Sequence, residues 1–215
     1  MSGPCVDQTL ALQLLGKPHL TIPPNTVLPL LSKIFERLIA IQICDFIEKS
    51  CTYKSTMSGF RRSHSTTTLL LKIRDDILKA MKKGELTLAI FSDYSKAFDT
   101  VSFSTILTKL NKIGFDRKAL LLMANYLTDR KQFVQIDDKV SSFGTCLFGV
   151  PQGSVLGPIL FNLYVADLQD SDLGPVCQYA DDTTQYEHFR PSKLQTAVEH
   201  IQHRAEVVQD WSTKI

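Results

Sequence analysis

Cysteine is scarce in this 215-residue chain, and its five cysteines form no recognisable framework. None belongs to a CxxC pair, and no histidine lies at the spacing of a zinc site. Scattered cysteines in odd number are typical of reduced thiols, so we expect an intracellular protein without a disulfide scaffold. The sequence also has no apolar run of membrane-spanning length and no signal-peptide pattern. We therefore expect no membrane attachment and a location in the nucleus or the cytoplasm.

Two common nucleotide-binding motifs are absent as well. The chain has neither the G-x-x-x-x-G-K-[ST] pattern of a P-loop nor the G-x-G-x-x-G pattern of a Rossmann site, which excludes both on sequence. A formal net charge of +2 does not by itself indicate a nucleic-acid-binding protein. With 44% hydrophobic residues, the chain can bury the core of one globular domain, with or without a sub-domain.

Hydrophobic periodicity predicts an α+β domain with helices packed on one face of an antiparallel sheet. The expected order is strand, two helices, hairpin, helix, hairpin, helix, and further helices precede the strand. In the helix over 28–49 we expect Leu31, Phe35 and Leu38 to face the core and Glu36 to face outward. The other expected helices cover 8–15, 68–83, 103–113, 117–127, 159–168 and 191–211.

Three boundaries rest on local signals. The nearly continuous apolar run 86–91 is typical of a buried central strand. Ser65 or Thr66 is expected to cap the helix that follows the basic loop. Three glycines and two prolines in 149–158 predict that no helix begins before about Pro158.

Two adjacent carboxylates, Asp181 and Asp182, occupy a predicted hairpin turn. Asp is a common turn residue, so a solvated turn and a chemical role are both open on this stretch alone. A third carboxylate, Asp93, ends the 86–91 strand, where ligand sites often lie. If these strands are neighbours, the three carboxylates meet, and such a group suits Mg²⁺. A glycosidase acid–base pair fits less well, because Asp181 and Asp182 are adjacent on one turn.

Two loops have both an ordinary structural interpretation and a ligand-binding one. The loop 58–67 contains Arg61 and Arg62 among hydroxyl side chains, a combination that often contacts phosphates. In the loop 149–158, glycines allow close backbone approach to a ligand, and the Gln152 amide both donates and accepts hydrogen bonds.

Three motifs in order resemble the palm motifs of reverse transcriptases: DYSKAFD at 93–99, GVPQGS at 149–154 and YADD at 179–182. The flanking stretches LSKIFER at 31–37, GFRRSHST at 59–66 and SVLGPILFNLY at 154–164 are similar to those of non-LTR, jockey-type retrotransposon polymerases. The similarity extends from about residue 27 to about residue 211.

This resemblance implies roles for named residues. Asp93, Asp181 and Asp182 would be catalytic and would bind two Mg²⁺ ions, with Mn²⁺ as a substitute. The nucleotide-binding residues would be Tyr94, Phe98, Gln152 and Gly153, with Phe98 excluding a 2′-hydroxyl by its ring volume. Arg61 and Arg62 would contact template or triphosphate phosphates.

The resemblance also implies a fold, partners and a reaction. The fold would be the palm of a right-hand polymerase with part of the fingers and without the thumb. Residues 27–215 would form the reverse transcriptase domain, after a non-family segment 1–26. The reaction would be two-metal transfer of deoxynucleotides to a primer 3′-hydroxyl on an RNA template. The alternative is a truncated, inactive retrotransposon relic with at most residual RNA binding. The sequence leaves the oligomeric state open.

Overall fold

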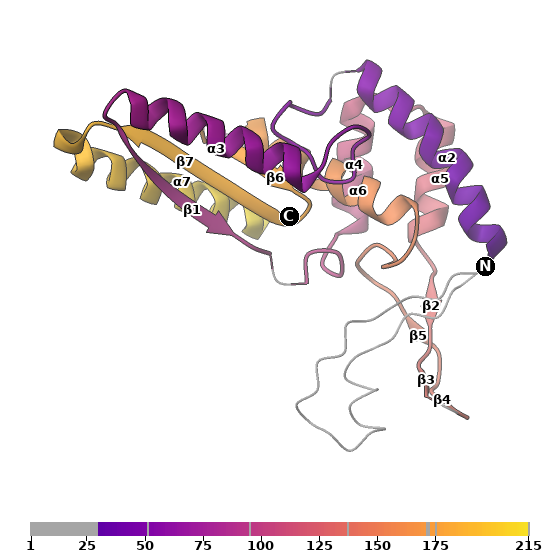
Figure 1. Cartoon of the computed structure of the whole chain (residues 1–215). Coiled ribbons are helices and arrows are strands. Elements are labelled where there is room, and N and C mark those ends of the chain that lie inside the picture. The colour runs from indigo at the N-terminus through magenta and orange to yellow at the C-terminus, as the bar shows by residue number, and fades with distance from the viewer. Residues whose placement is uncertain are drawn as a thin grey trace. The chain divides into compact units, whose positions relative to one another are not determined.

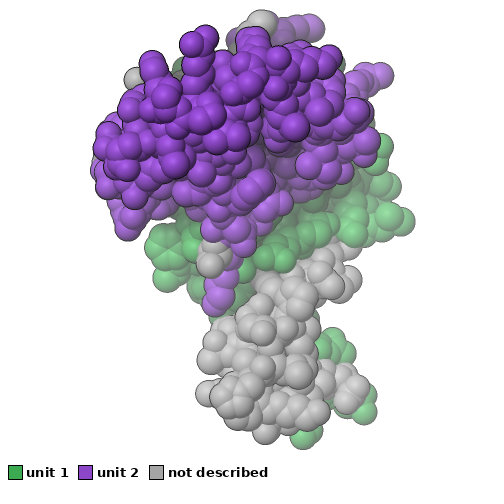
Figure 2. Space-filling view, turned by 60° about the vertical axis from the view of Figure 1, so that its left-hand side comes forward, with its two compact units in different colours: residues 1–46, 98–164 green, residues 47–97, 165–215 purple. Residues whose placement is uncertain are grey.

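A computed structural model of the chain describes residues 30–50, 52–94, 96–136, 138–170, 173–174 and 176–214. Two compact units make up the chain (Figure 2). Unit 1 comprises Met1–Phe46 and Phe98–Tyr164, and unit 2 comprises Ile47–Ala97 and Val165–Ile215. The helix expected over 8–15 and the expected domain boundary at residue 26 lie outside the described residues.

Unit 2 is built on a three-stranded antiparallel sheet (Figure 1). Its strands occur in the order β1-β7-β6, so the last strand in sequence lies in the middle. The elements of this unit are α3 (Thr66–Lys82), β1 (Leu86–Ser92), the 3₁₀-helix η1 (Ala166–Asp170), β6 (Val176–Tyr179), β7 (Asp182–Phe189), the 3₁₀-helix η2 (Pro191–Lys193) and α7 (Leu194–Lys214).

The two long helices of unit 2 cover opposite faces of this sheet (Figure 1). Side chains alternate between the faces of a strand, and β7 shows the result. Tyr186 packs with Leu69 of α3, whereas Glu187 forms an ion pair of 3.1 Å with Arg204 of α7. The prediction of helices on one face is therefore wrong. Periodicity identified both helices, but the alternation along β7 distributes them between two faces.

Strand β1 forms with almost the expected bounds, but it is not a buried central strand. Among the described strands it pairs only with β7, so it lies at one edge of the sheet. The Phe91 side chain is 78% exposed and Leu86 is 50% exposed. That part of the prediction is wrong, because an apolar run indicates a strand but does not say how many neighbours the strand has.

Unit 1 consists mainly of helices and one irregular hairpin. Helices α4 and α5 pack against each other, and Gly114 ends α4 in the left-handed region at φ 102°. The hairpin expected over 132–148 forms as two short antiparallel pairs, β2 with β5 and β3 with β4. The elements are α2 (Leu30–Lys49, whose last residues belong to unit 2), α4 (Phe103–Ile113), α5 (Arg117–Leu127), β2 (Lys131–Gln132), β3 (Gln135–Ile136), β4 (Lys139–Val140), β5 (Gly144–Thr145) and α6 (Leu156–Val165).

Helix α2 is oriented opposite to the expectation. Leu31, Phe35 and Leu38 are exposed by 58–75%, whereas Glu36 is only 4% exposed and lies on the buried side with Ile43. The prediction fails because apolar residues occur around most of this helix, and periodicity alone cannot choose between two apolar faces. The hydrogen bonds of Glu36 show which face is buried.

Helix α6 begins at Leu156, earlier than predicted, and contains Gly157 and Pro158 in its first turn. Proline is tolerated there because first-turn N–H groups have no intrahelical partner. The expectation that helix formation waits until about Pro158 is therefore wrong.

The Ser65 cap of α3 is confirmed: its hydroxyl accepts from the Thr68 N–H at 3.1 Å. No helix in the described parts of the chain is long and apolar enough to cross a membrane.

Candidate active site

The turn between β6 and β7 presents the two adjacent carboxylates. Tyr179 pairs with Asp182, so Ala180 and Asp181 form a two-residue hairpin loop. Ala180 has φ +55°, a left-handed value that glycine adopts more readily than alanine. Strained backbone of this kind occurs often at functional sites, where the surrounding structure holds it in place.

Asp93 reaches the same end of the sheet from β1. The last residue pair between β1 and β7 is Ser92 with Thr183, so Asp93 lies one residue beyond Ser92 and Asp182 one residue before Thr183. Antiparallel register therefore brings the end of β1 next to the turn that carries Asp181. This confirms that the strands carrying the three carboxylates are neighbours. The expectation was conditional on that pairing.

The three carboxylates influence one another electrostatically. The pKa of Asp181 is raised, first because partial burial disfavours its charged form, and further by the negative charges of Asp182 and Asp93. Within the described residues, none of these carboxylates forms an ion pair with lysine or arginine. Among the residues that the structure describes, the three carboxylates therefore form an electronegative group without a lysine or arginine in direct contact.

The fit of this site to a divalent cation is good in donor chemistry but incomplete in geometry. Carboxylate oxygens are the ligands that Mg²⁺ prefers. In the part of the chain that the structure describes, however, no three His, Cys, Asp or Glu side chains form a group able to hold an ion by themselves. Mg²⁺ is commonly held by one or two carboxylates together with substrate phosphates and water, so the donor set suits a site completed by its substrate.

An extended segment before α3 holds the strand that leads into the turn carrying Asp181. The Ser58 N–H donates to the Gln178 carbonyl and the Gln178 N–H donates to the Thr56 carbonyl, each at 2.9 Å. This segment therefore occupies the outer edge of β6. Gly59 follows, where a Cβ atom would lie 2.3 Å from the backbone nitrogen of Ala180. Glycine is needed here for close approach, and its φ is not in the left-handed region.

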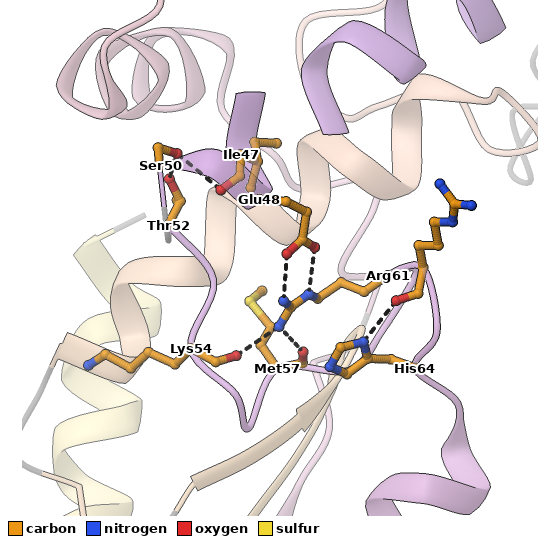
Figure 3. A network of polar contacts seen from close by, with 9 residues as sticks. Ile47, Glu48, Ser50, Thr52, Lys54, Met57, Arg61 and His64 are labelled. Carbon is orange, nitrogen blue, oxygen red and sulfur yellow. Dashed lines mark hydrogen bonds and ion pairs between the residues drawn. The ribbon is translucent and has the colours of Figure 1, made fainter. Parts of the chain in front are cut away.

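Arg61 is the centre of a polar network within unit 2 (Figure 3). Its guanidinium donates to both carboxylate oxygens of Glu48 at 3.1 and 3.0 Å and to the carbonyls of Lys54 and Met57 at 2.9 Å. Its side chain is 9% exposed. These contacts account for Arg61 without a phosphate. Arg62, by contrast, is exposed.

Three of the four residues expected to bind the nucleotide, Phe98, Gln152 and Gly153, lie in unit 1. The Phe98 carbonyl accepts from the Val150 N–H at 2.8 Å, and the Gln152 amide donates to Asp99 at 3.1 Å. The loop 149–154 is thus attached to the segment that follows Ala97. Gly153 has φ +83°, a backbone conformation that suits glycine.

Aromatic packing distinguishes Phe98 from Tyr94. The Phe98 ring stacks on Phe161 of α6 with centroids 4.4 Å apart. The Tyr94 ring packs in unit 2 beside Trp211 of α7 at 5.9 Å, and burial raises the pKa of its hydroxyl. The structure therefore gives Tyr94 a packing role in the core of unit 2.

Sequence reasoning missed two residues near these sites. The sequence predicts that Glu36 faces outward, and it assigns no contact to Gly59. No local sequence signal reveals the contacts of either residue. The partners of Glu36 lie about 120 positions away, and the backbone that leaves no room for a Cβ at Gly59 belongs to the turn at Ala180.

The sequence matches a known protein family. Residues 20–211 match the family described as reverse transcriptase (RNA-dependent DNA polymerase). The chain belongs to this family, and its curated homologues are RNA-directed DNA polymerases of mobile elements.

Three Drosophila melanogaster proteins illustrate the similarity. The chain is 35% identical over 145 residues to the probable RNA-directed DNA polymerase from transposon BS, over 67% of this chain and 16% of that protein. It is 34% identical over 161 residues to the probable polymerase from transposon X-element, over 74% of this chain and 18% of that protein. It is 29% identical over 197 residues to the polymerase from mobile element jockey, over 88% of this chain and 21% of that protein. The chain thus spans about a fifth of the length of these relatives.

Solved structures show the same fold at low identity. Apo telomerase from Candida tropicalis, truncated from its C-terminal domain, matches with a TM-score of 0.55 at 15% identity, over 80% of this chain and 36% of that one. Telomerase from Candida albicans, in complex with the TWJ fragment of telomeric RNA, matches with a TM-score of 0.53 at 13% identity, over 80% of this chain and 32% of that one. The mixed α/β fold is consistent with a polymerase palm.

Proposed function

We propose that this chain carries the polymerase centre of a mobile-element reverse transcriptase. The reaction would add deoxynucleotides to the 3′-hydroxyl of a DNA primer on an RNA template. One observation carries the proposal: the β6–β7 turn presents Asp181 and Asp182 beside the end of β1, where Asp93 lies. In a reverse transcriptase family member, this arrangement suits two-metal phosphoryl transfer.

The metal ligands in this proposal are Asp93, Asp181 and Asp182. Two Mg²⁺ ions, or Mn²⁺ as a substitute, would activate the primer hydroxyl and neutralise charge on the leaving pyrophosphate. Burial and, after it, repulsion from Asp182 and Asp93 raise the pKa of Asp181, and cation binding would relieve the repulsion. The strained turn at Ala180 and the Gly59 contact would keep the carboxylates at the end of the sheet.

The remaining functional residues would select and orient the nucleotide. Phe98, braced by Phe161, would exclude a 2′-hydroxyl, while Gln152 and Gly153 would contact the incoming nucleotide or the base pair. Arg62 would contact a phosphate of template or triphosphate, because its side chain is exposed. We do not extend that proposal to Arg61, whose donors are committed to Glu48 and backbone carbonyls.

The palm would consist of the three-stranded sheet with α3 and α7, within a reverse transcriptase domain over 27–215. The telomerase neighbours support this assignment through their fold. Part of the fingers would come from segments outside this sheet and its two helices.

Primer extension tests the function. The full chain is given an RNA template, a DNA primer, deoxynucleoside triphosphates and Mg²⁺, and Asp181→Asn is compared with Asp210→Asn on the exposed side of α7. Loss of one metal ligand is expected to reduce extension about a hundredfold or more, whereas the control keeps the parental rate. Extension that survives Asp181→Asn contradicts the metal-site assignment. A folded parent chain that binds RNA but extends no primer with Mg²⁺ or Mn²⁺ would indicate the inactive relic.

A further inference from the structure

Glu36 is a buried carboxylate with a defined task inside unit 1. Its side chain is 4% exposed, and one of its oxygens, Oε2, accepts from the N–H groups of Val155 at 2.7 Å and Leu156 at 3.2 Å. A buried carboxylate without partners is strongly unfavourable, so these two charge-assisted bonds are what keep Glu36 inside. They join α2 to the start of α6.

Two side chains, Glu36 and Ser154, accept hydrogen bonds from the N–H groups at the start of α6. Glu36 accepts from residues 155 and 156, and the Ser154 hydroxyl accepts from the Gly157 N–H at 2.8 Å. Pro158 has no N–H to satisfy. The negative charge of Glu36 also lies at the positive end of the helix dipole. Side chains thus fix the point at which α6 begins.

The nucleotide contacts expected in unit 1, the Phe98 ring and the Gln152 loop, depend on where α6 begins. The Ser154 hydroxyl donates to the Pro151 carbonyl at 2.7 Å, which ties the Gln152 loop to the helix start. One and a half turns further along α6, Phe161 stacks on Phe98. A shift of the start of α6 would therefore move the Gln152 loop and the support of the Phe98 ring together.

We propose that Glu36 is a positioning residue of the nucleotide site: by holding the start of α6 it sets the Gln152 loop and the Phe98 ring. The effect of Glu36 on nucleotide selection rests on the proposed polymerase function, whereas the anchoring of α6 by Glu36 does not. A carboxylate that only stabilises the fold would change the amount of active protein. A positioning carboxylate changes how the remaining active protein treats its nucleotide.

Four variants separate these roles. Glu36→Ala removes the acceptor, and Glu36→Gln keeps an oxygen at the same distance along the side chain but removes the charge. Arg37→Gln, on the exposed side of α2, controls for the loss of one charge. Ile43→Ala, on the buried side of the same helix, controls for general destabilisation.

The first measurement is hydrogen exchange at the amides of Val155 and Leu156 in the full chain, which needs no activity. Glu36→Ala is expected to speed exchange at these two amides about tenfold or more relative to the rest of α6, because a hydrogen bond to a charged group is lost. Glu36→Gln should restore most of the protection. If Glu36→Ala and Ile43→Ala raise exchange equally along α6, the anchoring role is overturned.

The second measurement is the ratio of deoxynucleotide to ribonucleotide incorporation, with KM and kcat determined separately. Glu36→Ala is expected to raise KM for the deoxynucleotide about tenfold and to lower discrimination, while Ile43→Ala lowers only the amount of active enzyme. Unchanged KM and discrimination in Glu36→Ala would overturn the nucleotide-site role. If the parent chain extends no primer, the polymerase function fails, and the exchange experiment still decides whether Glu36 anchors α6.

Discussion

A Cβ atom on Gly59 would lie 2.3 Å from the backbone nitrogen of Ala180, closer than side-chain carbons approach backbone atoms. The segment that pairs with the edge of β6 thus passes directly over the strained turn before Asp181. The contact links two stretches 121 positions apart in sequence. It explains why the residue that passes over this turn must be glycine.

Gly59→Ala is expected to destabilise unit 2 and to distort the carboxylate turn. The neighbour is backbone, which cannot rotate away, so the cost should be about 1–3 kcal/mol in the free energy of unfolding. Urea denaturation measures it. Gly144→Ala is the control, because its nearest contact would be at 3.9 Å and its φ is not left-handed. Equal stability of the two variants would contradict the close approach.

Arg61 and Arg62 are expected to respond in opposite ways to replacement. Arg61→Lys loses the paired bonds to Glu48 and should lower the free energy of unfolding by about 1–3 kcal/mol, since a lysine cannot reproduce the planar fork. Arg62→Ala should leave stability unchanged and weaken RNA binding. RNA titrations at several salt concentrations check this, because one lost phosphate contact lowers the salt slope by about one. A stable Arg61→Lys variant with weakened RNA binding would reverse the assignment.

The Asp76–Tyr186 contact predicts a pH dependence of stability. The Tyr186 hydroxyl donates to Asp76 at 2.7 Å, and this bond, followed by one from Lys72, lowers the pKa of Asp76 below 3.8. A group with a lowered folded-state pKa contributes stability above its unfolded pKa and loses it as the pH falls through the folded pKa. The stabilisation is therefore complete at neutral pH and declines below about pH 4.

Tyr186→Phe is the matched variant for this contact. It should be less stable than the parent by about 1–3 kcal/mol at neutral pH, and the difference should begin to shrink as the pH falls below about 4 and Asp76 takes up a proton. Urea denaturation from pH 6 down to pH 3 measures both curves. A difference that stays constant over this range would show that lost packing, and not the charged hydrogen bond, causes the change.

Phe98→Val is expected to admit ribonucleotides if the proposed polymerase function holds. The smaller side chain removes ring volume at the position that resembles the steric gate and also removes the stack on Phe161. Ribonucleotide incorporation should rise about tenfold or more relative to the parent, since rejection by a bulky side chain is lost. Phe103→Val, at the start of α4, is the control. Unchanged discrimination in Phe98→Val would count against the gate.

Local signals in the sequence predicted much of the fold. Helix and strand spans depend on periodicity and on caps such as Ser65, which act within a few residues. The sequence predicted that the three carboxylates meet only if the strand ending at Asp93 and the hairpin carrying Asp181 are neighbours, and the antiparallel pairing of β1 with β7 meets that condition.

Which side of each element faces inward was decided only by the tertiary structure. Helix α2 carries apolar residues around most of its surface, so the long-range bonds of Glu36 to the start of α6 determine its buried side. Only the tertiary structure shows the contacts of Arg61 and Gly59 as well. The partner of Arg61, Glu48, lies on another element, and the neighbour of Gly59 is the turn at Ala180. Sequence patterns act over one or two turns of chain, whereas these contacts join groups that are distant in sequence and that only folding brings together.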